Sequence, residues 1–193
     1  VGVTVFAATG ILPYATFRQV TGSMMRALVA HRHMRILNPL SNRDILSATA
    51  FVEAANLIII TLFVFGGLAL LFDAALPADL GGVYIALGLT WILAAGVGAL
   101  LSVLAALSDS FARIVPVVMR PLFWISGLFY TATELAGPVQ DLLWWNPVFH
   151  CVELLREGFF LGYRSPIAEA WVPAAFGAFC LLGALLLEGR TRG

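Results

Sequence analysis

The chain has 193 residues, of which 61% are hydrophobic and only 11% are charged, and its eleven basic and eleven acidic residues balance to a net charge of zero. A soluble domain is excluded, because one core could not bury so much apolar surface, and the neutral balance gives no signal for nucleic acid. We therefore expect an all-α integral membrane protein whose single transmembrane domain covers residues 1–193.

Five apolar segments, separated by polar turns, predict the transmembrane helices of this chain. They lie at about residues 1–17, 48–72, 82–107, 115–133 and 168–187. Ser41-Asn42-Arg43-Asp44 is typical of a capping box, so the second helix should begin before its apolar part does. With the orientation given below, an even-numbered parent would need a sixth span ahead of Val1.

A polar stretch at residues 18–44 follows the first span and holds five of the eleven arginines. Within it, Met24, Met25, Leu28 and Val29 form an apolar face opposite Arg26 and His33, which predicts a surface helix ended by Asn38-Pro39. Because positive residues are retained on the cytoplasmic side, this stretch, the turn at 108–113 and the C-terminus are expected inside.

The span at 82–107 carries small residues four apart, which let another helix approach closely. This row comprises Gly82, Ala86, Thr90, Ala94, Gly98, Ser102 and Ala106. We interpret it as a packing surface.

The external segment at 134–166 contains the clearest helix signal outside the spans. Asn146-Pro147 predicts a helix start, since asparagine can cap free amides and proline at the first position loses no hydrogen bond. An apolar stripe then recurs at Val148, Val152, Leu155 and Phe159. His150, Glu153 and Glu157 share another side, which we interpret as a solvated face of a helix at the membrane surface. Arg156 beside them argues against a metal site.

Enzyme chemistry has little support in the sequence. No span contains a histidine or a central aspartate, as an intramembrane protease would need, and no phosphate-binding loop occurs, so any ATP hydrolysis must come from a partner. The spans do carry aromatic residues. They are Tyr14, Phe17, Phe123, Trp124, Phe129 and Tyr130. Plain packing and a path for sugars, whose faces stack on flat rings, both remain open.

Four sequence features together make the chain resemble the permease subunits of ABC-2 type exporters, in the branch that exports capsular polysaccharide, O-antigen and related glycolipids. They are Gly10–Phe17 on a span, the basic loop ending at Asn38-Pro39-Leu40, the run Pro121–Tyr130 with its Ser126-Gly127 pair, and Asn146-Pro147 followed by His150, Glu153 and Arg156. The resemblance covers essentially the whole chain, and it implies an amphipathic gate helix and a first span ahead of Val1.

The resemblance implies six spans per subunit, a homodimer around a central channel, and a separate cytoplasmic ATPase that uses ATP and Mg²⁺. This chain would then bind no cofactor and have no catalytic residue. The 18–44 loop would hold a coupling helix, with Arg26, Arg32, His33 and Arg35 facing the ATPase. The 134–166 segment would form external re-entrant helices near the channel exit.

In this interpretation, two subunits in the bacterial inner (cytoplasmic) membrane export a lipid-linked glycan. The channel would be lined by Tyr14, Phe17, Trp124, Phe129 and Tyr130. Membrane lipids are further partners, and periplasmic export proteins are left open. Two alternatives also stay open: an ABC-2 pump for drugs or small lipids, which shares the topology, and a membrane scaffold that transports nothing, since topology alone does not prove flux.

Overall fold

The computed structural model describes residues 2–30, 41–72 and 76–191, and within them the chain is helical and has no strand. The elements in chain order are α1 (Gly2–Ala30), α3 (Asn42–Phe72), α4 (Leu80–Leu107), α5 (Asp109–Ile125), the 3₁₀ turn η1 (Ala132–Glu134), α6 (Gly137–Leu143), α7 (Pro147–Phe159) and α8 (Trp171–Thr191). The all-α prediction is confirmed for these residues.

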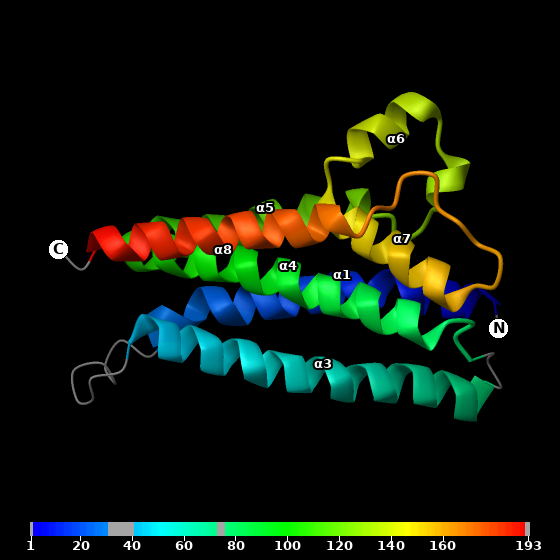
Figure 1. Cartoon of the computed structure of the whole chain (residues 1–193), viewed down its shortest axis with the longest axis horizontal. Coiled ribbons are helices and arrows are strands. Elements are labelled where there is room, and N and C mark those ends of the chain that lie inside the picture. The colour runs from blue at the N-terminus through cyan, green and yellow to red at the C-terminus, as the bar shows by residue number, and fades with distance from the viewer. Residues whose placement is uncertain (1, 31–40, 73–75, 192–193) are drawn as a thin grey trace.

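The long helices α1, α3, α4, α5 and α8 lie alongside one another and alternate in direction, while α6 and α7 gather at one end of the bundle (Figure 1). α4 is central, with α1, α7 and α8 packed against it. At the opposite end, which we call the Arg43 end, Arg43 of α3 pairs with the buried Glu188 of α8 at 3.4 Å. This pair ties the start of α3 to the end of α8.

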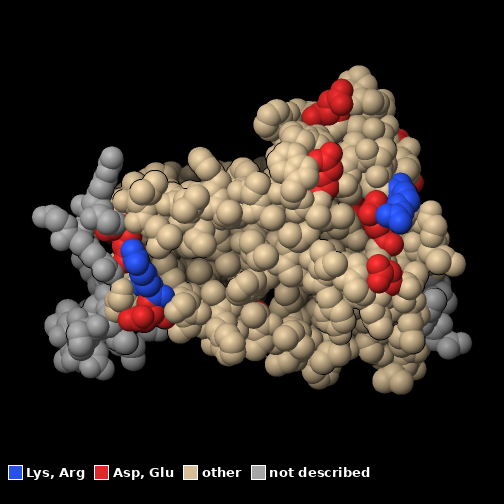
Figure 2. Space-filling view, viewed as in Figure 1, with Lys and Arg blue, Asp and Glu red and all other residues tan. Residues whose placement is uncertain are grey.

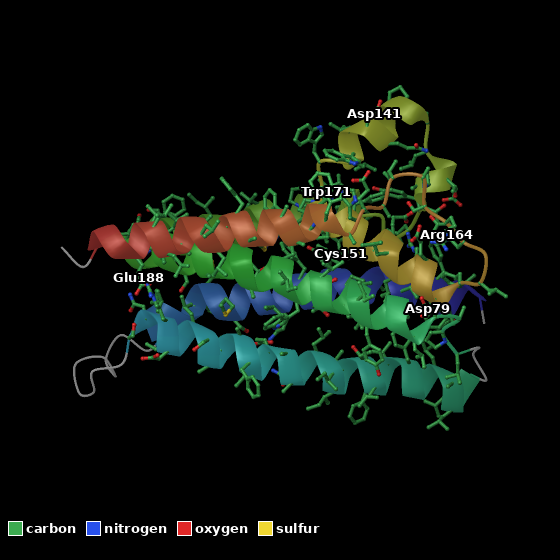
Figure 3. The ribbon with its side chains drawn as sticks, in the orientation of Figure 1. Asp79, Asp141, Cys151, Arg164, Trp171 and Glu188 are labelled. Atoms are coloured by element: carbon green, nitrogen blue, oxygen red, sulfur yellow. The ribbon has the colours of Figure 1, made fainter. Side chains whose placement is uncertain are left out.

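On the face seen in Figure 2, the charged side chains, in red and blue, gather at the two ends of the bundle, and other residues cover its middle. Glu188 lies at the Arg43 end, and Asp79, Asp141 and Arg164 lie at the α7 end (Figure 3). On this face, a band without charged side chains between two charged ends is the arrangement that a bilayer requires of a spanning bundle.

Three helices among the described residues are long and apolar enough to cross a membrane: Asn42–Leu71, Leu80–Leu107 and Trp171–Glu188. α1 runs beside them, but its apolar part gives way to Arg18 and Gln19. α5 has 17 residues and contains two prolines and two arginines. Neither α1 nor α5 is among these three helices, so length and composition together support three of the five predicted spans.

The predicted change from a span to a surface helix after Phe17 is not found, because α1 continues without a break to Ala30. Met24, Met25 and Leu28, expected on a surface helix, are buried in the bundle. They continue the face of α1 that packs on α4, where Thr21 donates a hydrogen bond to the Ala94 carbonyl at 3.3 Å. Contact with α4 thus keeps this part of the chain in the same helix.

The helix predicted at 115–133 is shifted toward the N-terminus. α5 begins at Asp109, because a single extended residue, Ser108 (φ −153°, ψ 123°), is enough to end α4 and start the next helix. It ends at Ile125, since Gly127 takes a φ of 75°, a conformation open to glycine but strained for other residues. Residues 126–131 are therefore a turn and not the end of a span.

The row of small residues on α4 packs as predicted over most of its length. A side chain at Gly98 would lie 2.5 Å from the Met24 side chain of α1, and one at Gly82 would lie 3.2 Å from Gly158 of α7. A second close crossing, outside this row, joins Gly96 to Gly177 of α8, where an added Cβ would meet the Gly177 carbonyl at 2.1 Å. Ala106 is the exception, because it is exposed.

The predicted capping box at the start of α3 is confirmed in part. The Ser41 amide donates to the Asp44 carboxylate at 2.9 Å, and the Ser41 hydroxyl accepts from the Arg43 amide at 3.4 Å. A capping box requires the hydroxyl to accept the third amide of the helix, and here it accepts the second. α3 begins at Asn42, six residues before the apolar segment expected at 48–72.

Candidate functional site

α7 begins where the sequence predicts it. Pro147 occupies the first helical position, and the side-chain oxygen of Asn146 accepts the Val148 amide at 3.1 Å. The nitrogen of the same carboxamide donates to the Ile125 carbonyl at 3.0 Å and to the Ser126 hydroxyl at 3.2 Å. One side chain therefore both caps α7 and fastens the end of α5.

The predicted solvated face of α7 is wrong. The apolar stripe and most of the polar side are both buried, with side chains that expose 1% or less at Val148, Val152, Leu155, His150, Glu153 and Arg156. α7 packs against α1 and α4, and the 126–135 segment covers its remaining polar side. The helix pattern of the sequence gave no sign of this cover, because it comes from residues more than twenty positions away.

Glu153 and Arg156 form an ion pair at 3.0 Å inside this cover. Arg156 also donates to the Tyr130 carbonyl at 2.7 Å and to the Leu128 carbonyl at 3.1 Å. Glu153 accepts from the Tyr163 hydroxyl at 2.6 Å and from the Ala132 amide at 3.3 Å. Burial lowers the pKa of Arg156 and the Glu153 carboxylate raises it, and the net shift is downward. We call these residues the α7 network.

Gly10 of α1 makes room for the α7 network. A Cβ at this position would lie 2.7 Å from the Leu128 carbonyl oxygen and 3.1 Å from the Arg156 guanidinium. One turn earlier, the Phe6 ring lies 4.1 Å from the Arg156 guanidinium carbon, in a cation–π contact. α1, the turn after α5 and α7 therefore meet at one point.

His150 is fully hydrogen bonded. Its Nδ1 accepts from the Glu169 amide at 3.0 Å, so its Nε2 carries the proton and donates to the Trp144 carbonyl at 2.8 Å. Burial lowers its pKa from the usual value, which favours this neutral form. Both ring nitrogens are occupied, so His150 links α6, α7 and the start of α8 and offers no nitrogen to a metal.

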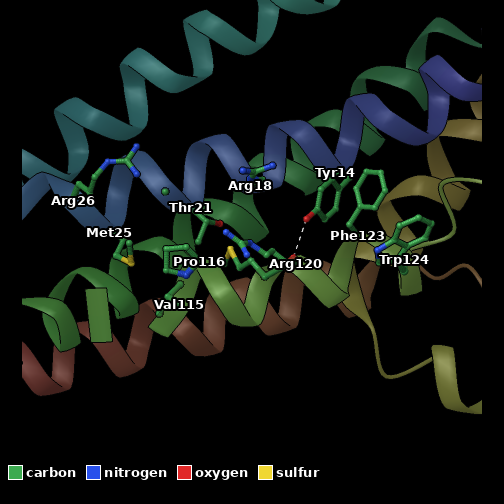
Figure 4. Close-up of a pocket in the computed structure, with 12 residues that line it drawn as sticks. Tyr14, Arg18, Thr21, Met25, Arg26, Val115, Pro116, Arg120, Phe123 and Trp124 are labelled. Atoms are coloured by element: carbon green, nitrogen blue, oxygen red, sulfur yellow. Dashed lines mark hydrogen bonds between the residues drawn. The ribbon is translucent and has the colours of Figure 1, made fainter. Parts of the chain in front are cut away.

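A groove of about 390 Å³ lies between α1 and α5 (Figure 4). We call it the α1/α5 groove. Its walls are Tyr14, Arg18, Thr21, Gly22, Met25 and Arg26 from α1, and Val115, Pro116, Met119, Arg120, Phe123 and Trp124 from α5. The Tyr14 hydroxyl donates to the Met119 carbonyl at 2.9 Å and joins the two helices.

The lining of the α1/α5 groove is cationic and aromatic. Arg18 and Arg120 approach its middle from opposite helices, Arg26 lies toward one end, and none of the described residues that line it is acidic (Figure 4). At 1.5 Å per residue, Arg18 is about 18 Å from the nearer end of α1, and Arg120 is about 7.5 Å from the nearer end of α5. Like charges that converge in one groove are stabilised by an anion between them.

The predicted channel aromatics divide between the groove and the core. Tyr14 and Trp124 line the groove, and Phe129 packs on Trp124 at 5.9 Å between ring centroids. Phe17 is instead buried in the core of the bundle. Tyr130 packs against Phe149 of α7, although its hydroxyl reaches the Trp124 carbonyl at 3.3 Å. Phe17 therefore packs inside the bundle, whereas Tyr130 is partly exposed beside α7.

Arg18 was expected in the cytoplasmic stretch at 18–44, and neither Arg18 nor Arg120 was predicted to line a groove. A signal was present, because Arg18 and Arg26 are eight apart and share a face of α1 with Tyr14, and Arg120 lies between two prolines of α5. Arg26, predicted to face an ATPase, also lines the groove. The other predicted coupling residues, Arg32, His33 and Arg35, lie outside the described residues.

Known proteins resemble this chain over most of its length. Residues 1–160 match the family model of the ABC-2 type transporters. The polysialic acid transport protein KpsM of Escherichia coli is 26% identical over 165 residues, which are 83% of this chain and 62% of KpsM. The capsule polysaccharide export inner-membrane protein BexB of Haemophilus influenzae is 28% identical over 171 residues, which are 86% of this chain and 61% of BexB. The chain thus spans about three fifths of these relatives.

Proposed function

The chain belongs to the ABC-2 type transporter family, and from this premise we propose that it is the permease subunit of an exporter that moves lipid-linked polysaccharide of capsule or O-antigen type across the bacterial inner membrane. The names of KpsM and BexB, which concern polysialic acid and capsule polysaccharide, support this cargo class. ATP and Mg²⁺ would be used by a separate ATPase, and two copies of the permease would enclose the path.

The observation that carries the proposal is the α1/α5 groove. A glycan offers flat sugar faces, which stack on rings such as Tyr14 and Trp124, and acidic or phosphate groups, which arginine binds with paired N–H donors. Trp124 is 67% exposed in the single chain, so its ring is available to a ligand or to a second subunit. A groove built for uncharged drugs would not need Arg18 and Arg120 at its middle.

In the proposed cycle, ATP-driven movement of the two subunits opens the path from the inner leaflet outward. The coupling surface would consist of Arg26, Arg32, His33 and Arg35, which are close in sequence to the end of α1. At the opposite end of α5, the α7 network holds the carbonyls of Leu128 and Tyr130. A displacement of α5 would therefore be transmitted to α7 near the exit.

The test is glycan export in a capsule-producing cell that expresses the full-length protein with its ATPase. Arg18→Gln and Arg120→Gln should each lower surface glycan about tenfold, the effect of one charge-assisted hydrogen bond of about 1.5 kcal/mol, without changing membrane abundance. Arg164→Gln, an exposed arginine at the α7 end, is the matched control and should export normally.

Normal export in both groove variants would refute the role of the groove. Energy-dependent efflux of small drugs, with no glycan at the cell surface, would favour the alternative ABC-2 pump. For the coupling surface, Arg32→Glu together with Arg35→Glu should abolish co-purification of the ATPase while insertion persists. Retained ATPase and retained export would remove the coupling assignment.

A further inference from the structure

A second pocket, of about 270 Å³, lies between α1 and α3 and is separate from the α1/α5 groove. Its polar residues are Thr16 and Gln19 from α1 and Glu53 and Asn56 from α3. Among the residues that the structure describes, no basic side chain lines it. The pocket therefore has the opposite charge to the groove on another face of α1.

Glu53 is the unusual member of this pocket. Its residue is only 6% exposed, and it makes no hydrogen bond or ion pair with any residue in the described part of the chain. A carboxylate on a residue with so little exposure, and with no partner in the protein, is costly in a protein interior and costlier beside a bilayer. The side chain lines the pocket beside Asn56 and Gln19, so a ligand there with N–H donors would supply the missing partner.

The pocket is amphipathic along its length. Gln19, Glu53 and Asn56 lie toward the Arg43 end, and because α1 and α3 are antiparallel, Leu12 and Ile60 lie together toward the other end. The α3 helix is the least buried of the three spanning helices, and Ile60 is exposed on it. The pocket thus opens on the exposed side of α3, with its acceptors nearer the Arg43 end and its apolar lining nearer the α7 end.

We propose that this pocket binds an aminophospholipid such as phosphatidylethanolamine. The Glu53 carboxylate accepts hydrogen bonds from the primary ammonium, the carboxamides of Gln19 and Asn56 contact the headgroup, and an acyl chain runs along Leu12 and Ile60. Hard metal ions take about six or more oxygen ligands, which a pocket with one carboxylate that opens to lipid does not offer. The site is independent of the cargo and of the α1/α5 groove.

The test uses the full-length protein in nanodiscs that contain phosphatidylglycerol mixed with either phosphatidylethanolamine or phosphatidylcholine, followed by native mass spectrometry of retained lipid. We expect about tenfold preferential retention of phosphatidylethanolamine over phosphatidylcholine, whose quaternary ammonium has no N–H donor, as for one charge-assisted hydrogen bond. Glu53→Gln should abolish the preference. Asp141→Asn, an exposed carboxylate at the α7 end, should keep it.

Glu53→Gln should still fold, because it removes an unpaired buried charge, and its melting temperature in lipid-free detergent should equal or exceed that of the wild type. A second variant, Ile60→Trp, narrows the apolar part of the pocket and should also reduce retention of phosphatidylethanolamine. Equal retention of the two lipids by the wild type, or undiminished preference in Glu53→Gln, would overturn the proposal. Stabilisation by sodium chloride alone, abolished by Glu53→Gln, would replace the lipid with an inorganic cation.

Discussion

Replacing Arg156 by methionine tests the α7 network. The substitution keeps much of the side-chain length but leaves the fully buried Glu153 without its cation and the carbonyls of Leu128 and Tyr130 without their donor. Removing one partner of a buried ion pair costs about 3–5 kcal/mol. At about 2–4 °C per kcal/mol for a chain of this size, the melting temperature should fall by about 6–20 °C.

The assay is thermal unfolding of the purified full-length protein in detergent, followed by tryptophan fluorescence. Arg164→Met is the matched control, because Arg164 is exposed at the same end of the bundle, and its change should stay within about 0.5 kcal/mol. The double variant Glu153→Gln, Arg156→Met should recover part of the loss, since the orphaned charge is gone. At the same 2–4 °C per kcal/mol, the limit of about 0.5 kcal/mol for the control corresponds to at most about 2 °C. If the melting temperature of Arg156→Met lay within about 2 °C of the control, the ion pair would not stabilise α7 as argued.

Three further results are expected. Burial lowers the pKa of folded His150, so the unfolded chain binds the extra proton, and stability should be complete above about pH 6.5 and decline below it. His150→Gln should reduce the change of melting temperature with pH, and an unchanged pH dependence would assign the titration to another group. Gly10→Ala should cost about 1–3 kcal/mol by clash with the turn after α5, whereas Gly67→Ala in open space should be neutral or stabilise by up to about 1 kcal/mol; equal melting temperatures would contradict the close approach. Trp124→Ala should reduce export about two- to tenfold at normal abundance, while Phe17→Ala should lower abundance itself through a core loss of about 3–5 kcal/mol; the reverse pattern would exchange their roles.

Helix starts could be predicted because their causes are local. The Asn146 cap, Pro147 and the Ser41 to Asp44 capping box each act within three residues, and the structure contains the first two and part of the third. The small residues of α4 were equally informative, because lack of a side chain permits close packing whichever helix approaches. The all-helical class follows from composition and the need to satisfy backbone groups in lipid.

The environment of the site could not be predicted, because its causes are distant. The acceptors for Arg156 lie 26 and 28 residues earlier in the chain, so the sequence around α7 shows a charged face and no sign of what buries it. Arg18 was similarly taken for the end of a span. It continues α1 because the groove accommodates its side chain on one face of the helix while the next turn packs on α4.

The spacing of the two buried charges has a consequence for biosynthesis. Glu153 and Arg156 are one turn apart on the same helix, so they can neutralise each other as soon as α7 coils, before it reaches α1 and α4. The acceptors at Leu128 and Tyr130 have already been translated by then, because they precede α7 in the chain. The nascent protein can therefore bury both ions as a neutral pair, without first having to carry a lone charge into the half-assembled bundle.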